Sequence, residues 1–192
     1  MQAATSSNLS IPETGDLLAV VVIGRNEGQR LKKSLISTLG DKRKLVYVDS
    51  GSTDGSVELA KSLGVDVVEL DPAMPFTAAR GRNAGFNYLK EKGVTFPYVQ
   101  FVDGDDEIDG QWLAGGVKTL AENPDVGIVA GRKKECFPDN SVYNRLFEME
   151  WDTEIGEVTE VSGTCMVRAK VFEQVGGFNE TLIAGEDPEL CL

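Results

Sequence analysis

The sequence predicts an α/β protein built around a mostly parallel sheet that is flanked by helices. Short apolar runs rich in β-branched residues alternate with segments whose apolar residues recur at helical spacing. Alternation of this kind requires crossover connections, which join parallel strands. The length of 192 residues fits one domain with a sizeable buried core.

The first two strand–helix units lie in the N-terminal third of the chain. The run LLAVVVIG at 17–24 predicts a strand that is buried on both faces. The next helix is marked by apolar residues at helical spacing and a terminal glycine: Leu31, Leu35, Leu39 and Gly40. A second strand is predicted at 45–49. The helix after it shows the same pattern, with Val57, Ala60, Leu63 and Gly64.

Two more units follow with the same rhythm. A third strand is predicted at 65–70, and residues 77–92 predict a helix that ends before Gly93. A fourth strand is predicted at 98–102, where the sequence is YVQFV. The apolar positions of the next helix are Trp112, Leu113, Val117 and Leu120. A fifth strand is then predicted at 126–130.

The strand–helix rhythm breaks beyond residue 131. Residues 139–160 are acidic and aromatic, and residues 161–175 predict a strand and a short helix. This break divides the predicted domain, 17–192, into an N-terminal half at 17–131 and a C-terminal half at 132–192.

Residues 1–16 predict a flexible leader. They lack the basic start and the apolar middle of a signal peptide. No apolar run reaches the ~18–20 residues that a membrane-spanning helix needs, so no span is expected.

The charge of the chain limits its partners. Thirty-one acidic residues against 19 basic ones give a formal net charge of −12. Nucleic acid and anionic membranes are polyanions, so neither is expected as the main partner. The three cysteines are far apart and odd in number, which disfavours a zinc site or a disulfide framework and favours a reduced cytosolic setting. Because the chain has no histidine, acid–base chemistry must come from carboxylates, lysine, tyrosine or cysteine.

Acidic loops follow the second and fourth predicted strands. Ligands of open parallel sheets lie outside the carboxyl ends of the strands. One loop begins at Asp49 and contains Asp54, and the other has five carboxylates in the seven residues 103–109. Clustered carboxylates repel one another, so two such loops at one sheet edge indicate a functional site.

The spacing of Asp103 and Asp105 fits a divalent cation. Mg²⁺ and Mn²⁺ prefer oxygen ligands and are often held by one or two carboxylates together with substrate phosphates. Alternate residues at a strand end share a face, so both carboxylates can point the same way. A solvated acidic turn is the alternative reading. A calcium loop of the EF-hand type fails, because Ile108 and Ala114 replace the required glycine and glutamate.

Two arginines near the start of the helix at 77–92 could hold a phosphate. Arg80 and Arg82 lie where free backbone donors and the helix dipole favour an anion. The alternative is a pair of surface arginines on an amphipathic helix. The loop at 24–28 is not GxGxxG, and GxxxxGK[ST] is absent, so a Rossmann dinucleotide site and a P-loop are not predicted.

Taken in order, the motifs resemble those of glycosyltransferase family 2, whose members have the A-type glycosyltransferase fold. They span residues 17–191 and are VVVIGRNEG, VYVDSGSTDGS, AARGRNAG, FVDGDDE, GTCMVRAKVFEQVGGFNE and GEDPEL. Each motif alone is weak, whereas the ordered set is specific. The resemblance implies a nucleotide-diphosphate sugar donor, a divalent cation (Mn²⁺ or Mg²⁺) and a single displacement that inverts the anomeric centre.

The resemblance implies that residues 17–131 are a donor-binding half and residues 132–192 an incomplete acceptor-side half, and it assigns donor-side roles. Asp49 resembles the aspartate that contacts the donor base, with Asp54 in the same loop, and Glu27 matches the acid near the nucleotide. Arg82 resembles the arginine that reaches the donor, with Arg80 as an alternative contact. The Asp-x-Asp motif that meets ribose, metal and diphosphate is matched by Asp103 and Asp105, and Asp106 is an extra neighbour.

The acceptor side is matched by two segments. Gly163 and Thr164 correspond to the segment beneath the acceptor sugar, and Glu186 and Asp187 to the pair that holds the catalytic base. The alternative reading makes Asp187 the N-cap of a helix that has proline at its first position. Only five residues follow Asp187, whereas many members of the family continue further, so a C-terminally truncated chain is expected.

Other activities remain as alternatives. The first is a catalytically inactive module of the same fold that binds a nucleotide sugar or a partner. A sugar-nucleotide pyrophosphorylase would need a lysine-bearing glycine-rich loop after the first strand, and residues 24–28 contain no lysine. The expected acceptor is a glycan, a lipid-linked or another hydroxyl compound, and the expected location is cytosolic, including the cytosolic face of a membrane.

Overall fold

A six-stranded sheet forms the centre of the protein in the computed structural model, which describes residues 14–40 and 43–192. The spatial order of its strands is β3-β2-β1-β4-β6-β5. Their bounds are β1 Leu18–Gly24, β2 Lys44–Asp49, β3 Asp66–Glu69, β4 Tyr98–Asp103, β5 Ile128–Ala130 and β6 Cys165–Arg168. Each of the five predicted strands at 17–24, 45–49, 65–70, 98–102 and 126–130 corresponds to one of β1–β5 within two residues.

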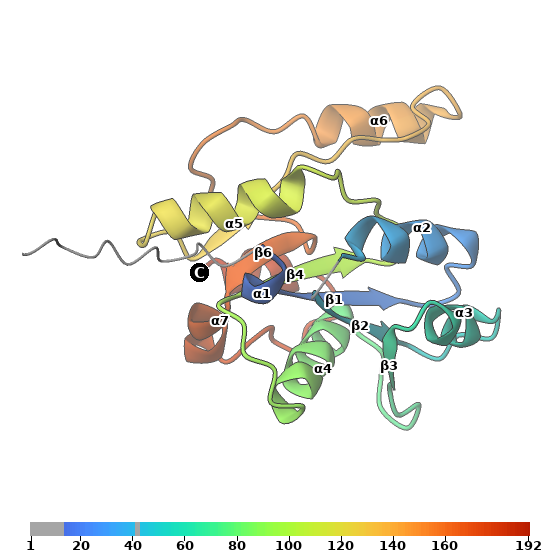
Figure 1. Cartoon of the computed structure of the whole chain (residues 1–192). Helices are drawn as coiled ribbons and strands as arrows, with labels where there is room; N and C mark the ends of the chain where they lie inside the picture. The colour runs from blue at the N-terminus through green and yellow to red at the C-terminus, as the bar shows by residue number, and fades with distance from the viewer. Residues whose placement is uncertain (1–13, 41–42) are drawn as a thin grey trace, which may run out of the picture.

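Helices cover both faces of the sheet (Figure 1). Their bounds are α1 Thr14–Leu17, α2 Gln29–Thr38, α3 Ser56–Ser62, α4 Ala78–Glu91, α5 Trp112–Glu122, α6 Val142–Glu150, α7 Ala169–Val175 and α8 Glu186–Leu190. Helices α2, α3 and α5 pack on one face and α4 and α7 on the other, which gives three layers.

The sheet is mostly parallel, as predicted. Strands β1, β2, β3 and β4 pair in parallel. The strand predicted at 126–130, β5, does not pair with β4, the strand before it in the chain. Instead β6 lies between β4 and β5 and is antiparallel to both. Residues 132–192 therefore complete the same sheet as residues 17–131.

Alternating side chains of the central strands form two apolar cores. In β1, Ala19 and Val21 face α4, while Leu18, Val20 and Val22 face α2 and α5. All five are at most 1% exposed, as the continuous apolar run predicts.

The close approach of α4 to β1 depends on Gly85. A Cβ at this position would lie 2.3 Å from Cγ1 of Val21, so only glycine fits. This contact fixes the start of α4, and with it Arg82, near the carboxyl end of β1.

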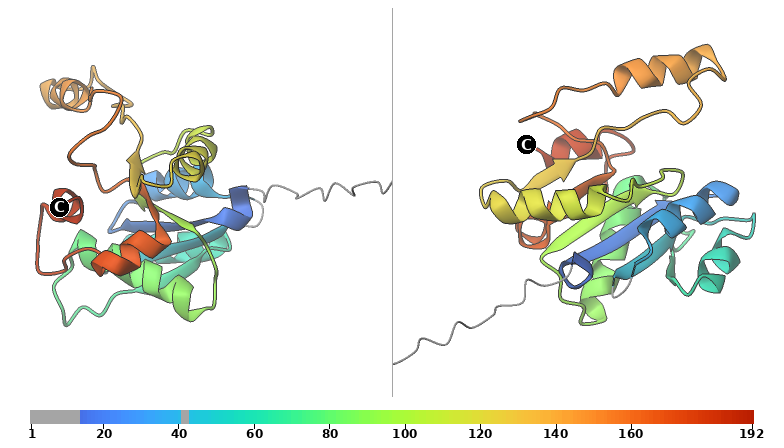
Figure 2. Two further views of the ribbon diagram at one scale, coloured as in Figure 1. Left: turned by 90° about the vertical axis from the view of Figure 1, so that its left-hand side faces the viewer. Right: turned by 45° about the horizontal axis from the view of Figure 1, so that its top comes forward.

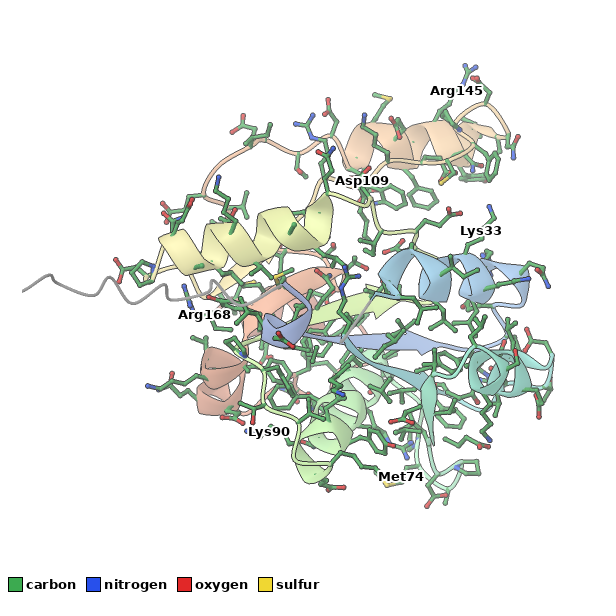
Figure 3. The ribbon with its side chains drawn as sticks, viewed as in Figure 1. Lys33, Met74, Lys90, Asp109, Arg145 and Arg168 are labelled. Atoms are coloured by element: carbon green, nitrogen blue, oxygen red, sulfur yellow. The ribbon has the colours of Figure 1, made fainter. Side chains whose placement is uncertain are left out.

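Helix α6 lies outside the three layers (Figures 1 and 2), and none of its residues is buried. Its Arg145 points away from the sheet and pairs with Asp139 (Figure 3). At the other end of the chain, α1 occupies residues 14–16 of the predicted leader, and residues 1–13 of that leader lie outside the described part. Within residues 14–40 and 43–192, no helix is both long and apolar enough to cross a membrane.

Candidate active site

The two acidic loops meet at one edge of the sheet. Strand β1 lies between β2 and β4, and backbone hydrogen bonds join the residues that follow β2 and β4 to the carboxyl end of β1. The amide of Ser50 donates to the carbonyl of Gly24 (3.0 Å), and the amide of Gly104 donates to that of Ile23 (2.7 Å). The loops after β2 and β4 therefore lie side by side across the end of β1, as the parallel arrangement predicts.

Asp49 organises the loop after β2. It is 2% exposed, and its Oδ1 accepts a hydrogen bond from the Tyr47 hydroxyl at 2.9 Å. Its Oδ2 accepts from the amides of Gly51 and Ser52 at 2.9 and 2.8 Å. Both carboxylate oxygens thus hold the loop in shape, and burial raises the pKa of the Tyr47 hydroxyl, which keeps this donor protonated.

The loop after β1 is tied to the loop after β2 through Asn26. Its backbone is left-handed, with φ 57°, a conformation that asparagine tolerates better than most residues. The backbone amide of Asn26 donates to the hydroxyl of Ser52, and the side-chain Oδ1 of Asn26 accepts from the backbone amide of Thr53 at 2.7 Å. Beside this junction, Asp54 is exposed, and hydrogen bonds from Ser56 lower the pKa of its carboxyl.

Glu27 belongs to the loop after β1 and lies close to the second acidic loop. Its Oε2 is 2.7 Å from Nη2 of Arg30, and Nη1 of the same arginine is 3.7 Å from Oδ2 of Asp105. Burial and the negative charge of Asp105 raise the pKa of Glu27, while Arg30 acts in the opposite direction. Arg30 is thus the shared counter-charge of these two carboxylates.

Arg82 joins the end of β4 to α8. Its guanidinium is 3% exposed, and Nη2 lies 2.8 Å from Oδ1 of Asp103. Its Nη1 lies 2.7 Å from Oε1 of Glu186 and 3.1 Å from Oδ1 of Asp187. The face of the guanidinium also lies 5.2 Å from the ring centre of Phe178. One buried cation therefore holds carboxylates that are 21, 104 and 105 residues away in sequence.

Gly163 makes room for this arginine. A Cβ at Gly163 would stand 1.8 Å from Nη2 of Arg82, a distance that no side chain could occupy. The next residue, Thr164, donates its hydroxyl hydrogen to Oδ2 of Asp106 and accepts from the Asp103 amide at 3.3 Å. The two residues predicted for the acceptor side thus lie in one charged cluster with Arg82, Asp103 and Asp106.

Asp187 lies in the first turn of α8, and its side chain is 23% exposed. Burial raises its pKa to about 6; Arg82 lowers it, and the charges of Glu186 and Asp103 raise it further. The reading of Asp187 as an N-cap is wrong. The cap residue is Gly185, whose φ of 84° is left-handed, and no side chain caps this end of the helix.

Arg80 has a different task from Arg82. It donates to three carbonyls in the segment before α4, those of Asp71, Met74 and Pro75, at 3.0–3.2 Å. None of the carboxylates of the cluster is among its partners. Arg80 therefore supports the 71–75 loop, and Arg82 is the arginine at the acidic site.

Lys133 is a further member of the cluster, and the motifs did not identify it. Its Nζ lies 2.8 Å from Oδ2 of Asp106 and 3.8 Å from Oδ2 of Asp103. Burial lowers the pKa of Lys133, but the charges of the two aspartates outweigh this effect, and the pKa is raised. The run Arg132-Lys133-Lys134 in a chain of net charge −12 was the available signal.

Asp105 is the more solvent-exposed of the two carboxylates in the Asp-x-Asp motif. Its side chain is 47% exposed against 30% for Asp103, and its only ion-pair partner among the described residues is Arg30 at 3.7 Å. The part of the chain that the structure describes contains no group of three acidic or cysteine side chains that could by itself enclose a metal ion. Two carboxylates at this edge nevertheless fit a cation whose remaining ligands come from a phosphate-bearing ligand and water.

The family model for glycosyl transferase family 2 matches residues 19–176, most of the chain. The chain belongs to glycosyltransferase family 2. The match includes both acidic loops, Arg82 and the Gly163–Thr164 segment. It ends before α8, so the roles of Glu186 and Asp187 rest on the geometry described above.

The chain is also similar to individual proteins of known name or structure. Glycosyltransferase AglE of Haloferax volcanii is 29% identical over 186 residues, which cover 88% of this chain and 58% of the relative. The mannosyltransferase PcManGT of Pyrobaculum calidifontis, solved with GDP-Man and Mn²⁺, superposes with a TM-score of 0.67 at 21% identity, over 90% of this chain and 50% of that one. Glucosyl-3-phosphoglycerate synthase of Mycobacterium tuberculosis, solved with Mn²⁺, UDP and its product, gives a TM-score of 0.56 at 20% identity, over 81% and 58%.

These structures confirm the A-type glycosyltransferase fold for this family 2 chain. The chain spans about half the length of the relatives it matches. Its predicted residues fall into two groups in space. Around Arg82 and Lys133 lie Asp103, Asp106, Gly163, Thr164, Glu186 and Asp187, whereas Glu27, Asp49, Asp54 and Asp105 line the neighbouring loops.

Proposed function

We propose that this family 2 chain transfers a sugar from a nucleotide-diphosphate sugar to an acceptor hydroxyl, with inversion at the anomeric carbon and dependence on a divalent cation. The observation that carries the proposal is the contact of Arg82 with both Asp103 and Asp187. It brings the end of β4, where parallel sheets bind ligands, to the carboxylate best suited to act as a base.

The donor would lie across the ends of β1, β2 and β4. The nucleoside would contact the loop that Asp49 shapes, with Asp54 and Glu27 beside it, and the diphosphate would reach Asp103 and Asp105. The solved relatives with GDP-Man or UDP and Mn²⁺ have the same fold, which supports this placement. A divalent cation held by Asp105 and Asp103 would supply positive charge that stabilises the leaving diphosphate.

Asp187 is our candidate for the base. The acceptor oxygen attacks the anomeric carbon, the bond from that carbon to the diphosphate oxygen breaks, and the acceptor proton passes to the Asp187 carboxylate. A pKa of about 6 leaves this carboxylate mostly ionised at neutral pH yet basic enough to accept a proton. Arg82 is then a positioning residue, because its buried guanidinium holds Asp187 and Asp103 in fixed relative positions.

The acceptor would approach from the side of Gly163 and Thr164. The chain offers no histidine for acid–base work, and a carboxylate, Asp187, is the residue that we propose for it. The proposed acceptor is a glycan, a lipid-linked or another hydroxyl compound.

A ligand screen tests the proposal directly. Nucleoside diphosphates and their sugars are added with and without Mn²⁺, and thermal unfolding is followed. A ligand that binds only the folded state at a hundredfold excess over its Kd adds about 2.7 kcal/mol to the free energy of unfolding. We expect the shift to require Mn²⁺ and to disappear in Asp105→Asn. The matched control is Glu107→Gln, which removes one exposed charge of the same loop and should keep the shift.

Donor hydrolysis in the same samples separates a transferase from a binding module. Metal-dependent release of the sugar to water supports catalysis. Binding of the donor without hydrolysis or transfer would favour an inactive nucleotide-sugar-binding module, and an Asp105→Asn variant with unchanged metal dependence would refute the metal assignment.

A further inference from the structure

Lys133 lies where a cation is needed in the acidic cluster. Its ammonium is the second positive charge on Asp103, because Arg82 contacts Oδ1 of that aspartate and Lys133 lies 3.8 Å from Oδ2. It also makes the 2.8 Å ion pair with Asp106. The lysine comes from the segment after β5, so a tethered cation reaches the cluster from the acceptor-side half of the chain.

The position of Lys133 conflicts with a divalent cation on the same carboxylates. An ion bound by Asp103 and Asp105 would share Asp103 with the ammonium, which lies 3.8 Å from Oδ2 of that aspartate, and like charges repel each other. The oxygen of Asp103 that faces Lys133 is also the one that Arg82 leaves free for an ion. The ion and Lys133 therefore compete for the same carboxylate, that of Asp103.

The structure leaves room for Lys133 to move. A solvent-accessible hollow of about 480 Å³ adjoins it, lined by Arg132, Lys133, Lys134, Glu148, Met149 and Asp152. The ammonium also lies 5.8 Å from the ring centre of Trp151, which offers a favourable surface as it turns. A lysine is a compact charge on a flexible stem, which suits a change of partner.

We propose that Lys133 is a tethered counter-cation that competes with the divalent ion for Asp103 and becomes a partner of the donor diphosphate once the ion is bound. This inference rests on the proposed function. With no ligand, Lys133 neutralises the carboxylates and weakens binding of the ion. When ion and diphosphate bind together, the phosphate charge replaces the carboxylates as the partner of the ammonium.

The consequence is cooperative binding of ion and donor. The factor by which the nucleoside diphosphate tightens ion binding equals the factor by which the ion tightens nucleoside diphosphate binding. Lys133 enlarges this factor in two ways. It weakens binding of the ion when no donor is present, and it strengthens binding of the donor diphosphate when the ion is present. An enzyme with this device holds the ion firmly only when the donor is present.

The test is a binding measurement on Lys133→Met. Titration of the apo protein with Mn²⁺ alone, followed by calorimetry or by the electron paramagnetic resonance of free Mn²⁺, should show ion binding about tenfold tighter than in the wild type. Titration with UDP and with GDP at saturating Mn²⁺ should show binding about tenfold weaker for whichever nucleotide the wild type binds. Opposite changes in the two titrations are the signature of the exchange.

Three further variants make the test decisive. Lys134→Met removes the same charge from the adjacent exposed residue, which takes part in none of the ion pairs between described residues, and should leave both titrations near the wild type. Lys133→Arg keeps the charge and should keep Mn²⁺ binding weak. Lys133→Gln replaces the methionine variant if thermal unfolding shows that the latter does not fold.

The possible outcomes separate the two ideas. If the wild type binds Mn²⁺ and a nucleoside diphosphate together but Lys133→Met and Lys133→Gln bind Mn²⁺ no more tightly, the Lys133 inference is wrong and the proposed function stands. If both binding steps weaken in these variants, Lys133 is a structural residue and the inference is again wrong. If the wild type binds neither ligand, both proposals fail.

Discussion

The backbone of Gly163 lies against the guanidinium of Arg82 so closely that a Cβ at Gly163 would stand 1.8 Å from Nη2. The missing side chain lets the arginine reach Asp103 with one nitrogen and both Glu186 and Asp187 with the other. A residue that resembled part of the acceptor platform in sequence thus also determines whether the charged centre can form.

Gly163→Ala should displace Arg82 and destabilise the fold. The added methyl group must push a buried guanidinium away from its carboxylates, and overpacking of this kind costs about 1–3 kcal/mol. The free energy of unfolding from denaturant titration measures this cost. The control is Gly115→Ala, a helical site with nothing within 4 Å of the added Cβ, where alanine should stabilise by about 0.5–1 kcal/mol. A Gly163→Ala variant as stable as the wild type would mean that Arg82 adjusts freely.

Arg82→Lys should not preserve the site, although it keeps the charge. The planar fork of arginine reaches three carboxylates from two nitrogens, and one ammonium cannot reproduce that geometry. A charge-assisted hydrogen bond is worth about 1.5–3 kcal/mol, and its loss would release Asp103, which we place at the diphosphate. We therefore expect donor binding to weaken by about one to two orders of magnitude. Calorimetry with the nucleoside diphosphate and Mn²⁺ measures this change.

The matched substitution is Arg80→Lys on the same helix. Arg80 holds only carbonyls of the 71–75 loop, so this variant should alter the stability of that loop and leave donor affinity within about twofold. A larger loss of affinity in Arg80→Lys than in Arg82→Lys would assign the donor contact to Arg80.

The strands and the meeting of the acidic loops could be predicted from the sequence, whereas the order of the last two strands could not. The strands were predictable because runs such as the one at 17–24 carry their burial in local composition. The meeting of Asp49 and Asp103 at one edge followed from the parallel connections alone. The insertion of β6 between β4 and β5 was not predictable, because it depends on pairing between strands that lie far apart in the chain.

The charged centre was predictable only in part. The motifs identified Arg82, Asp103 and Asp187 separately, but their contact depends on a chain path that brings Arg82 to Asp187, 105 residues further on. Lys133 was missed because a lysine has no spacing pattern that indicates its partner. The pKa of Asp187 likewise depends on the burial of its side chain and on the charges around it, which no local pattern encodes.

The raised pKa of Asp187 predicts a pH dependence of stability. Its carboxyl titrates at about 6 in the folded protein against an ordinary value of 3.8, so the folded state holds this proton more tightly than the unfolded state. The contribution of Asp187 to stability is therefore complete below about pH 4 and is lost as pH rises through 6. Denaturant titrations between pH 4 and 7.5 should show a contribution to the free energy of unfolding that falls as pH rises and that is absent in Asp187→Asn. Identical pH profiles for the two proteins would contradict the raised pKa.

Asp187→Asn should separate donor binding from sugar transfer. The amide keeps the size of the side chain but cannot take the acceptor proton, and loss of a general base typically costs at least ~10²-fold in rate. Donor affinity should remain nearly intact, because Asp103 and Asp105 are unchanged. Transfer or donor hydrolysis in the wild type should also fall about tenfold per pH unit below 6, as Asp187 becomes protonated. The matched control is Glu189→Gln, a nearby carboxylate of α8 that makes no contact with Arg82 among the described residues and should retain activity. Near-normal turnover by Asp187→Asn would move the base to another carboxylate, and loss of activity in Glu189→Gln alone would identify which one.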